Sequence, residues 1–160
     1  MSNTEVELDR SATSAEACFE EMLEHARAIC ARRGERLTDL RQTVLELVCR
    51  SATPVKAYEI LDALKAVGRS SAPPTAYRTL DFLQCLGLVH KIERINAYVG
   101  CSHPLKSHSG MFLICSGCGN AVELADNGLA SRIDAQAEKA GFKVHDRTVE
   151  VSGVCDACRH

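Results

Sequence analysis

Residues 73–87, PPTAYRTLDFLQCLG, carry the pattern of one complete helix. Two prolines precede Thr75, near which we expect the helix to open, and Gly87 supplies a C-terminal cap. Apolar residues recur between them at helical spacing: Ala76, Leu80, Leu83 and Leu86. The opposite face presents Tyr77 and Arg78 near the N-terminal end. Such a face suits the reading of base edges in the DNA major groove, and a solvated charged face is the alternative.

Further helical segments precede this one. Apolar residues at helical spacing predict a first helix over residues 19–30, which Gly34 stops. A second helix is expected to begin after Thr38, a suitable N-cap residue. A third lies between Pro54 and Gly68.

After the fourth helix the apolar period changes from helical to extended. Residues 88–93 and 97–101 are predicted to form two short strands. Three helices followed by a hairpin predict a winged helix-turn-helix, with an N-terminal helix before it, over residues 1–101. A polar hinge over 102–110 is expected next. Residues 111–160 are predicted to form two strands, a helix and a last strand. Such a small α/β unit needs a metal or a partner subunit for stability. The fold class is therefore α+β.

Composition excludes several classes of protein. Of the 160 residues 46% are apolar and 25% charged, which excludes a long disordered chain. Runs of about 20 apolar residues are missing, so we expect no membrane partner. Aromatic residues make up 4% and Trp is absent, which argues against a stacking platform for single-stranded nucleic acid. The net charge is −2, whereas residues 36–100 alone carry +3, which mildly suits a phosphate backbone.

Cysteine is unusually frequent, with nine in the chain. The odd number and a polar N-terminus without an apolar stretch lead us to expect reduced thiols in the cytoplasm. Cys115 and Cys118 form one C-x-x-C pair, and Cys155 and Cys158 form another. Two such turns can complete a closed tetrahedral shell of thiolates around one Zn²⁺ ion. The pairs thus predict a structural zinc site; four unrelated thiols and a dithiol redox pair are the alternatives.

A second, more dispersed set of potential ligands flanks the junction between the two predicted units. It consists of His90, Cys101, His108 and Glu123. A metal ion bound there would lock the relative orientation of the units. Spacing alone does not join these residues, and an exposed histidine, a core cysteine and a solvated glutamate are the ordinary alternatives.

Three stretches together resemble the ferric uptake regulator family, and within it the zinc uptake regulator branch. They are RLTDLR (36–41), PPTAYRTLDFL (73–83) and GLVHK (87–91), and both C-x-x-C pairs follow at matching places. The resemblance extends over residues 16–158. It implies a homodimeric, zinc-responsive regulator of transcription, mainly a repressor of zinc uptake genes, that binds palindromic operator DNA. It also implies that the α/β unit is a dimerisation domain.

The resemblance further implies two zinc ions per chain. The structural zinc is expected on Cys115, Cys118, Cys155 and Cys158, and the regulatory zinc on His90, Cys101, His108 and Glu123. We expect the DNA contacts to come from the following residues: Thr75, Tyr77, Arg78, Arg41, Tyr58 and Lys91.

The sequence departs from the iron-sensing branch of the family, which typically has a histidine cluster before the first C-x-x-C. Here only His108 remains, and Cys101 supplies a thiolate. A thiolate with imidazole and carboxylate suits tetrahedral Zn²⁺ better than a six-coordinate ferrous ion. An iron- or peroxide-responsive regulator of the same fold is the alternative, and His103 and His145 leave a third metal site open.

An enzyme is not expected. The chain lacks the H-x-E motif of zinc deaminases, the H-E-x-x-H motif of zinc proteases and a glycine-rich phosphate loop.

Overall fold

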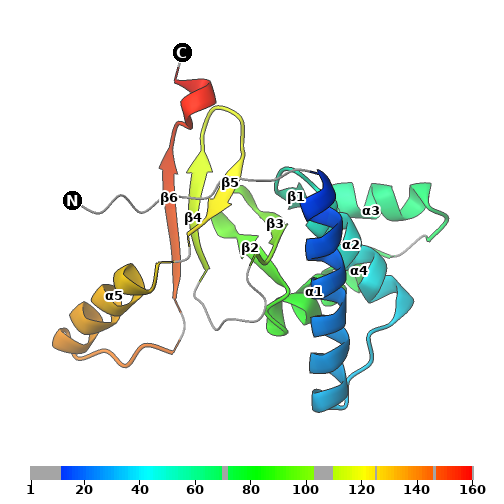
Figure 1. Cartoon of the computed structure of the whole chain (residues 1–160), viewed down its shortest axis with the longest axis horizontal. Helices are drawn as coiled ribbons and strands as arrows, with labels where there is room; N and C mark the ends of the chain where they lie inside the picture. Colours follow the sequence, from blue (N-terminus) through cyan, green and yellow to red (C-terminus); the bar gives the residue numbers. More distant parts are fainter. Residues whose placement is uncertain (1–11, 70–71, 103–109, 125, 146, 160) are drawn as a thin grey trace.

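The computed structural model describes residues 12–69, 72–102, 110–124, 126–145 and 147–159. A group of helices lies on one side of the molecule and helix α5 on the other, with two small sheets between them (Figure 1). None of the described helices is both long enough and apolar enough to cross a membrane.

Four helices form the first group. They are α1 (Ala12–Arg33), α2 (Asp39–Arg50), α3 (Ala57–Ala66) and α4 (Pro73–Cys85). The side chain of Thr38 caps α2 as predicted, because it accepts a hydrogen bond from the backbone N–H of Arg41. Helix α4 begins before Thr75, since Pro73 and Pro74 fit a first turn in which backbone N–H groups need no helical partner. The helices bury one apolar core, including Val44, Leu45, Ile60, Leu64, Leu80 and Leu83.

The predicted hairpin forms the wing. Its strands are β2 (Val89–Ile92) and β3 (Ala97–Gly100), joined by the short 3-10 helix η1 (Glu93–Ile95). Asn96 closes this turn with φ of +48°, a conformation that asparagine tolerates better than most residues. Strand β1 (Val55–Lys56) adds to the other edge of β3, so the antiparallel order is β1-β3-β2.

The second sheet has the order β5-β4-β6. Strand β4 (Gly110–Cys115) pairs antiparallel with β5 (Ala121–Glu123) and parallel with β6 (Thr148–Gly153). Helix α5 (Asn127–Lys139) connects β5 to β6. Asp126 caps its N-terminus, because its Oδ1 accepts hydrogen bonds from two backbone N–H groups. A last 3-10 helix, η2 (Asp156–Cys158), follows β6.

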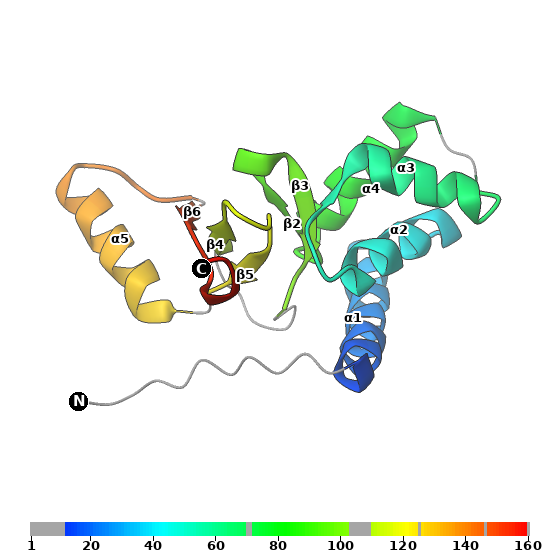
Figure 2. The same cartoon turned by 90° about the horizontal axis from the view of Figure 1, so that it is seen from above.

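The two sheets lie side by side, and the wing faces the second sheet (Figure 2). An apolar cluster fills this junction: Ile92, Phe112 and Ile114 are buried, with Ile95, Val99 and Ala121 around them. Of the predicted hinge, residues 103–109 lie outside the described residues, and Gly110 already belongs to β4. A winged helix-turn-helix followed by a small α/β unit is therefore the observed architecture, and the predicted α+β class is confirmed.

Candidate metal centres and DNA-recognition surface

The two C-x-x-C pairs come together at one end of the second sheet. Cys115 ends β4, Cys118 lies in the turn before β5, Cys155 precedes η2, and Cys158 is its last residue. Their four sulfur atoms all lie within 4.8 Å of one another. The Sγ atoms of Cys118 and Cys155 are 3.8 Å apart, which matches the edge, about 3.8 Å, of a tetrahedron with Zn–S bonds of about 2.3 Å. The donor set and its geometry fit a structural Zn²⁺ ion.

The backbone around these thiols allows their close approach. A Cβ atom on Gly117 would lie 3.0 Å from the Cβ of Cys158, so a larger residue there would require the second pair to move by a few tenths of an ångström. Gly119 takes a φ of +73°, the left-handed conformation that turns the chain back into β5. The backbone N–H of Cys155 donates to the Sγ of Cys115 at 3.3 Å.

Hydrogen bonds around the sulfurs shift two of the four thiol pKa values in opposite directions. Backbone N–H groups, that of Cys155 above all, lower the pKa of Cys115 to about 6. Hydrogen bonds with the neighbouring thiols, that of Cys155 first, raise the pKa of Cys158 to about 12. The crowded sulfurs thus compete for protons, and a bound cation would allow all of them to be thiolates.

Three of the four predicted regulatory ligands meet at the junction between wing and second sheet. His90 comes from β2, Cys101 follows β3, and Glu123 ends β5; one ligand atom from each lies within 4.8 Å of the others. The Nε2 atom of His90 is 3.2 Å from Oε1 of Glu123, and the Glu123 side chain is only 4% exposed. A partly buried imidazole beside a buried thiol and a buried carboxylate fits a tetrahedral zinc ion with a fourth ligand.

Neighbouring groups orient two of these ligands. The backbone N–H of Ser102 donates to Oε2 of Glu123 at 2.9 Å, which turns Oε1 toward His90. The ring of Phe112 meets the His90 ring edge-on, with centroids 5.5 Å apart. Outer contacts of this kind fix ligand orientation in metal sites. Sequence reasoning missed both residues, because a backbone N–H and an apolar ring carry no motif.

Three further histidines were potential ligands. His108, the fourth predicted ligand, and His103 lie outside the described residues. His145 is exposed after α5 and belongs to neither described ligand group.

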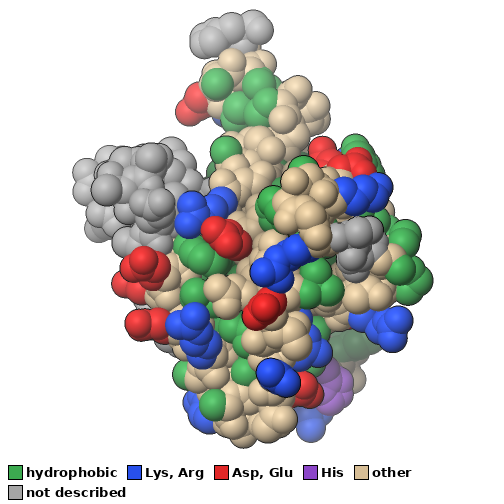
Figure 3. Space-filling model, turned by 90° about the vertical axis from the view of Figure 1, so that its right-hand side faces the viewer, with side chains coloured by type: hydrophobic (Ala, Val, Ile, Leu, Met, Phe, Trp, Pro, Cys, Tyr) green, Lys and Arg blue, Asp and Glu red, His purple; other side chains and the backbone are tan. Residues whose placement is uncertain are grey.

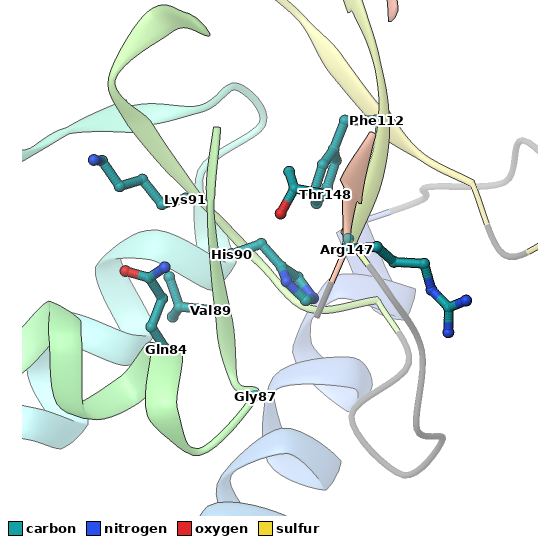
Figure 4. A pocket seen from close by; sticks show the side chains of 9 residues that line it. Gln84, Gly87, Val89, His90, Lys91, Phe112, Arg147 and Thr148 are labelled. Carbon is teal, nitrogen blue, oxygen red and sulfur yellow. The ribbon is translucent and has the colours of Figure 1, made fainter. Parts of the chain in front are cut away.

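A cavity of about 240 Å³ adjoins the junction. Its lining includes His90, Lys91, Phe112, Arg147 and Thr148. His90 extends from β2 toward the second sheet, whereas Lys91 and Arg147 point to opposite sides (Figure 4). The Arg147 guanidinium pairs with Asp134 on α5 and donates to the carbonyl of Ala130. The cavity therefore separates its positive charges and does not gather them around one ligand.

The predicted recognition face of α4 is exposed. Tyr77 is 46% exposed, and Arg78 lies beside it, with Nε donating to the carbonyl of Pro74 at 3.3 Å. Thr75 is half-buried in the first turn, where its carbonyl accepts from Thr79. The face formed by the helices mixes Lys and Arg with Asp and Glu side chains (Figure 3).

The other three predicted DNA contacts differ in their surroundings. Tyr58 is exposed at the start of α3, with its ring 5.9 Å from Nζ of Lys56. Lys91 pairs with Glu93 at 2.6 Å, and this hydrogen bond raises the pKa of the lysine. Arg41 stacks on the ring of Phe82, with 3.3 Å between the guanidinium carbon and the ring centroid. Arg41 therefore packs against α4 and stays partly exposed.

Known proteins are similar to this chain in sequence. Residues 32–152 match the model of the ferric uptake regulator family. The chain is 38% identical over 140 residues to the zinc uptake regulation protein of Escherichia coli (strain K12), which covers 87% of this chain and 82% of that protein.

Solved structures agree with this relationship. A zinc uptake regulator complexed with zinc and DNA superposes with a TM-score of 0.81 at 38% identity, covering 88% of this chain and 94% of that one. Holo XcZur gives a TM-score of 0.77 at 44% identity and covers 88% and 97% of the two chains. Apo XcZur gives a TM-score of only 0.52 at 43% identity. It covers 90% of this chain and 99% of that one. The family model spans most of the residues and the E. coli relative aligns over most of both chains, so the chain belongs to the ferric uptake regulator family.

Proposed function

We propose that this chain is a zinc-responsive regulator of transcription, mainly a repressor of zinc uptake genes, that binds palindromic operator DNA as a zinc-loaded homodimer in the cytoplasm. One observation carries the proposal. His90 and Cys101 from the winged helix and Glu123 from the second sheet bring their ligand atoms within 4.8 Å. One ion bound there ties the DNA-binding region to the rest of the chain.

Each chain would hold two zinc ions with different roles. The four sulfurs of Cys115, Cys118, Cys155 and Cys158 form a closed shell, which suits a structural ion. The junction site draws ligands from both regions of the chain, which suits an ion that controls their orientation. His108 is proposed as its fourth ligand.

The mechanism follows from differential affinity. A ligand shifts a conformational equilibrium only as far as it binds one state better than the other. The junction ligands converge only while the wing lies against the second sheet, so zinc favours this arrangement. Support comes from the TM-scores, which are 0.77 to holo XcZur and 0.52 to apo XcZur.

A homodimer is supported by the outer face of the second sheet. Leu113 on β4 and Val151 on β6 are direct neighbours in register and are 41% and 48% exposed. Apolar side chains gathered on an exposed sheet face suit burial against a second copy. A dimer of this kind would present two α4 helices to successive turns of the major groove.

Binding of a duplex to protein of known zinc content tests the function. The duplex is a palindrome that the zinc-loaded protein selects from a random library, and binding is measured with zinc and with a chelator. We expect binding only with zinc, and ferrous ion or peroxide in place of zinc should not reproduce the response. Equal binding in zinc and chelator would refute the zinc response, and a response to iron or peroxide alone would favour the alternative regulator.

The Cys101→Ser variant locates the sensor. It should remain dimeric, lose about one zinc per chain and fail to bind the duplex at zinc levels that saturate the wild type. Cys30→Ala is the matched control, because Cys30 is a buried thiol of the α1 core that belongs to neither cysteine cluster. Normal operator binding with a lowered zinc count in Cys101→Ser would show that the junction ion is not the sensor.

A further inference from the structure

One row of side chains crosses the second sheet beneath the wing. In the register of the strands, Phe112 on β4 is paired with Glu123 on β5 and with Glu150 on β6. Directly paired residues on neighbouring strands point to the same face of a sheet, and the strands lie about 4.8 Å apart. The two carboxylates therefore stand on opposite sides of the aromatic ring, about 10 Å from each other.

Every member of this row contacts the winged helix. Glu123 lies 3.2 Å from His90 of the wing and accepts from the backbone N–H of Ser102, directly after the winged helix, at 2.9 Å. Phe112 is buried against the wing in the junction cluster with Ile92. These two contacts belong to the metal-binding end and the apolar centre of the junction.

The third contact needs no metal. One oxygen of Glu150 accepts from the backbone N–H of Glu93 at 2.7 Å, and the other accepts from that of Arg94 at 3.0 Å. Both N–H groups begin the 3-10 turn at the tip of the wing. The ammonium of Lys91 pairs with the side chain of Glu93, which offsets a second negative charge next to the carboxylate.

We propose that Glu150 is a positioning residue that fixes the orientation of the winged helix together with the junction zinc. A single attachment at the zinc site would leave the winged helix free to pivot about that point. A second attachment at the other end of the Glu123–Phe112–Glu150 row stops the rotation. Since a dimer must hold its two recognition helices at a set separation, this orientation determines operator affinity. The inference rests on the proposed function.

Two substitutions and a control test the role of Glu150. Glu150→Ala removes both acceptors, and Glu150→Gln keeps one oxygen but turns an amide NH₂ group toward the wing. Glu138→Ala is the control, because it removes an exposed carboxylate from α5 in the same region of the chain. All are measured as the full-length, zinc-loaded protein for amide hydrogen exchange by NMR, zinc content and operator affinity.

We expect exchange at the Glu93 and Arg94 amides to accelerate at least about tenfold in Glu150→Ala, while amides in the helical core and the zinc content keep their wild-type values. Operator affinity should fall about tenfold per protomer, the scale of a charge-assisted hydrogen-bond pair partly exposed to water. The exchange rates and operator affinity of Glu150→Gln should lie between those of the wild type and Glu150→Ala. Those of Glu138→Ala should match the wild type.

Two results would overturn the inference. One is unchanged exchange at both wing amides in Glu150→Ala. The other is accelerated exchange with unchanged operator affinity, because the contact would then exist without positioning the winged helix. Failure of the wild type to bind operator in a zinc-dependent manner would instead refute the proposed function, and the exchange data would show whether the contact itself is present.

Discussion

Replacement of Arg41 tests how α4, the proposed recognition helix, is held within the winged helix. The Arg41 side chain leaves the first turn of α2, and its guanidinium carbon lies 3.3 Å from the ring centroid of Phe82 on α4. Its Nη1 donates to the carbonyl of Arg36 at 2.5 Å and lies 3.7 Å from the carboxylate of Glu35. One side chain thus connects α4 to α2 and to the segment before it.

The size of the effect follows from these contacts. A cation–π contact contributes about 0.5–1 kcal/mol when exposed and about 2 when desolvated. At 25% exposure the Arg41 side chain lies between these limits. The charge-assisted hydrogen bond adds about 1.5 kcal/mol, and the half-exposed ion pair adds little. We therefore expect Arg41→Ala to lower the free energy of unfolding of the winged helix by about 2–3 kcal/mol.

Urea unfolding followed by tyrosine fluorescence measures this change. The chain has no Trp, and its three tyrosines, Tyr58, Tyr77 and Tyr98, all lie in the winged helix, so the signal reports on this region alone. With a slope of about 2 kcal/mol per M, the midpoint should fall by about 1–1.5 M. A double-mutant cycle with Phe82→Leu should give a coupling of about 1 kcal/mol.

Stability and salt dependence together distinguish the packing role of Arg41 from a contact with DNA phosphate. If Arg41 is instead a phosphate contact, Arg41→Ala leaves the midpoint unchanged and reduces the salt dependence of DNA binding by about one ion per protomer. A fall in stability with an unchanged salt slope supports the packing role.

Three further predictions concern the cysteine cluster and α4. Cys118→Ser breaks a closed thiolate shell, so we expect loss of that zinc by elemental analysis and loss of the dimer by ultracentrifugation; a dimer with full zinc content would contradict this. Gly117→Ala places a Cβ 3.0 Å from that of Cys158 and should speed zinc transfer to a chelator about tenfold, whereas an unchanged rate would show that the turn relaxes freely. Arg78→Ala should weaken operator binding by about 1–3 kcal/mol per half-site with zinc content unchanged. An equal loss on random DNA would make Arg78 a phosphate contact.

The parts of the fold that sequence could predict depend on local rules. Helical spacing, the Thr38 cap and the change of period at the wing each depend on a few neighbouring residues, and the structure confirms them. Strand β1 escaped prediction because two residues show no period. The parallel pairing of β4 with β6 escaped it because register between distant strands leaves no mark in either strand alone.

The candidate sites also differ in how far the sequence could predict them. The C-x-x-C spacing specified four cysteines as one group, since each pair is local and its chemistry is restrictive. His90, Cys101 and Glu123 share no such spacing, and only the family resemblance joined them before the structure brought them together. Glu150 was not predicted at all, because its role depends on standing beside Phe112 in the sheet.

If the proposed junction site binds zinc, the row across the second sheet also explains how the ion acts as a switch. Without a cation, the Glu123 carboxylate is a charge buried at 4% exposure beside the Cys101 side chain at 2%, and its desolvation opposes the arrangement in which the wing lies against the sheet. The hydrogen bonds of Glu150 and the apolar contacts of Phe112 favour that arrangement. When opposing contributions nearly balance, a modest difference in zinc affinity between the two arrangements is enough to change which one dominates. On this reasoning a stronger wing contact would make DNA binding less dependent on zinc, and a weaker one would require more zinc for the same occupancy of the operator.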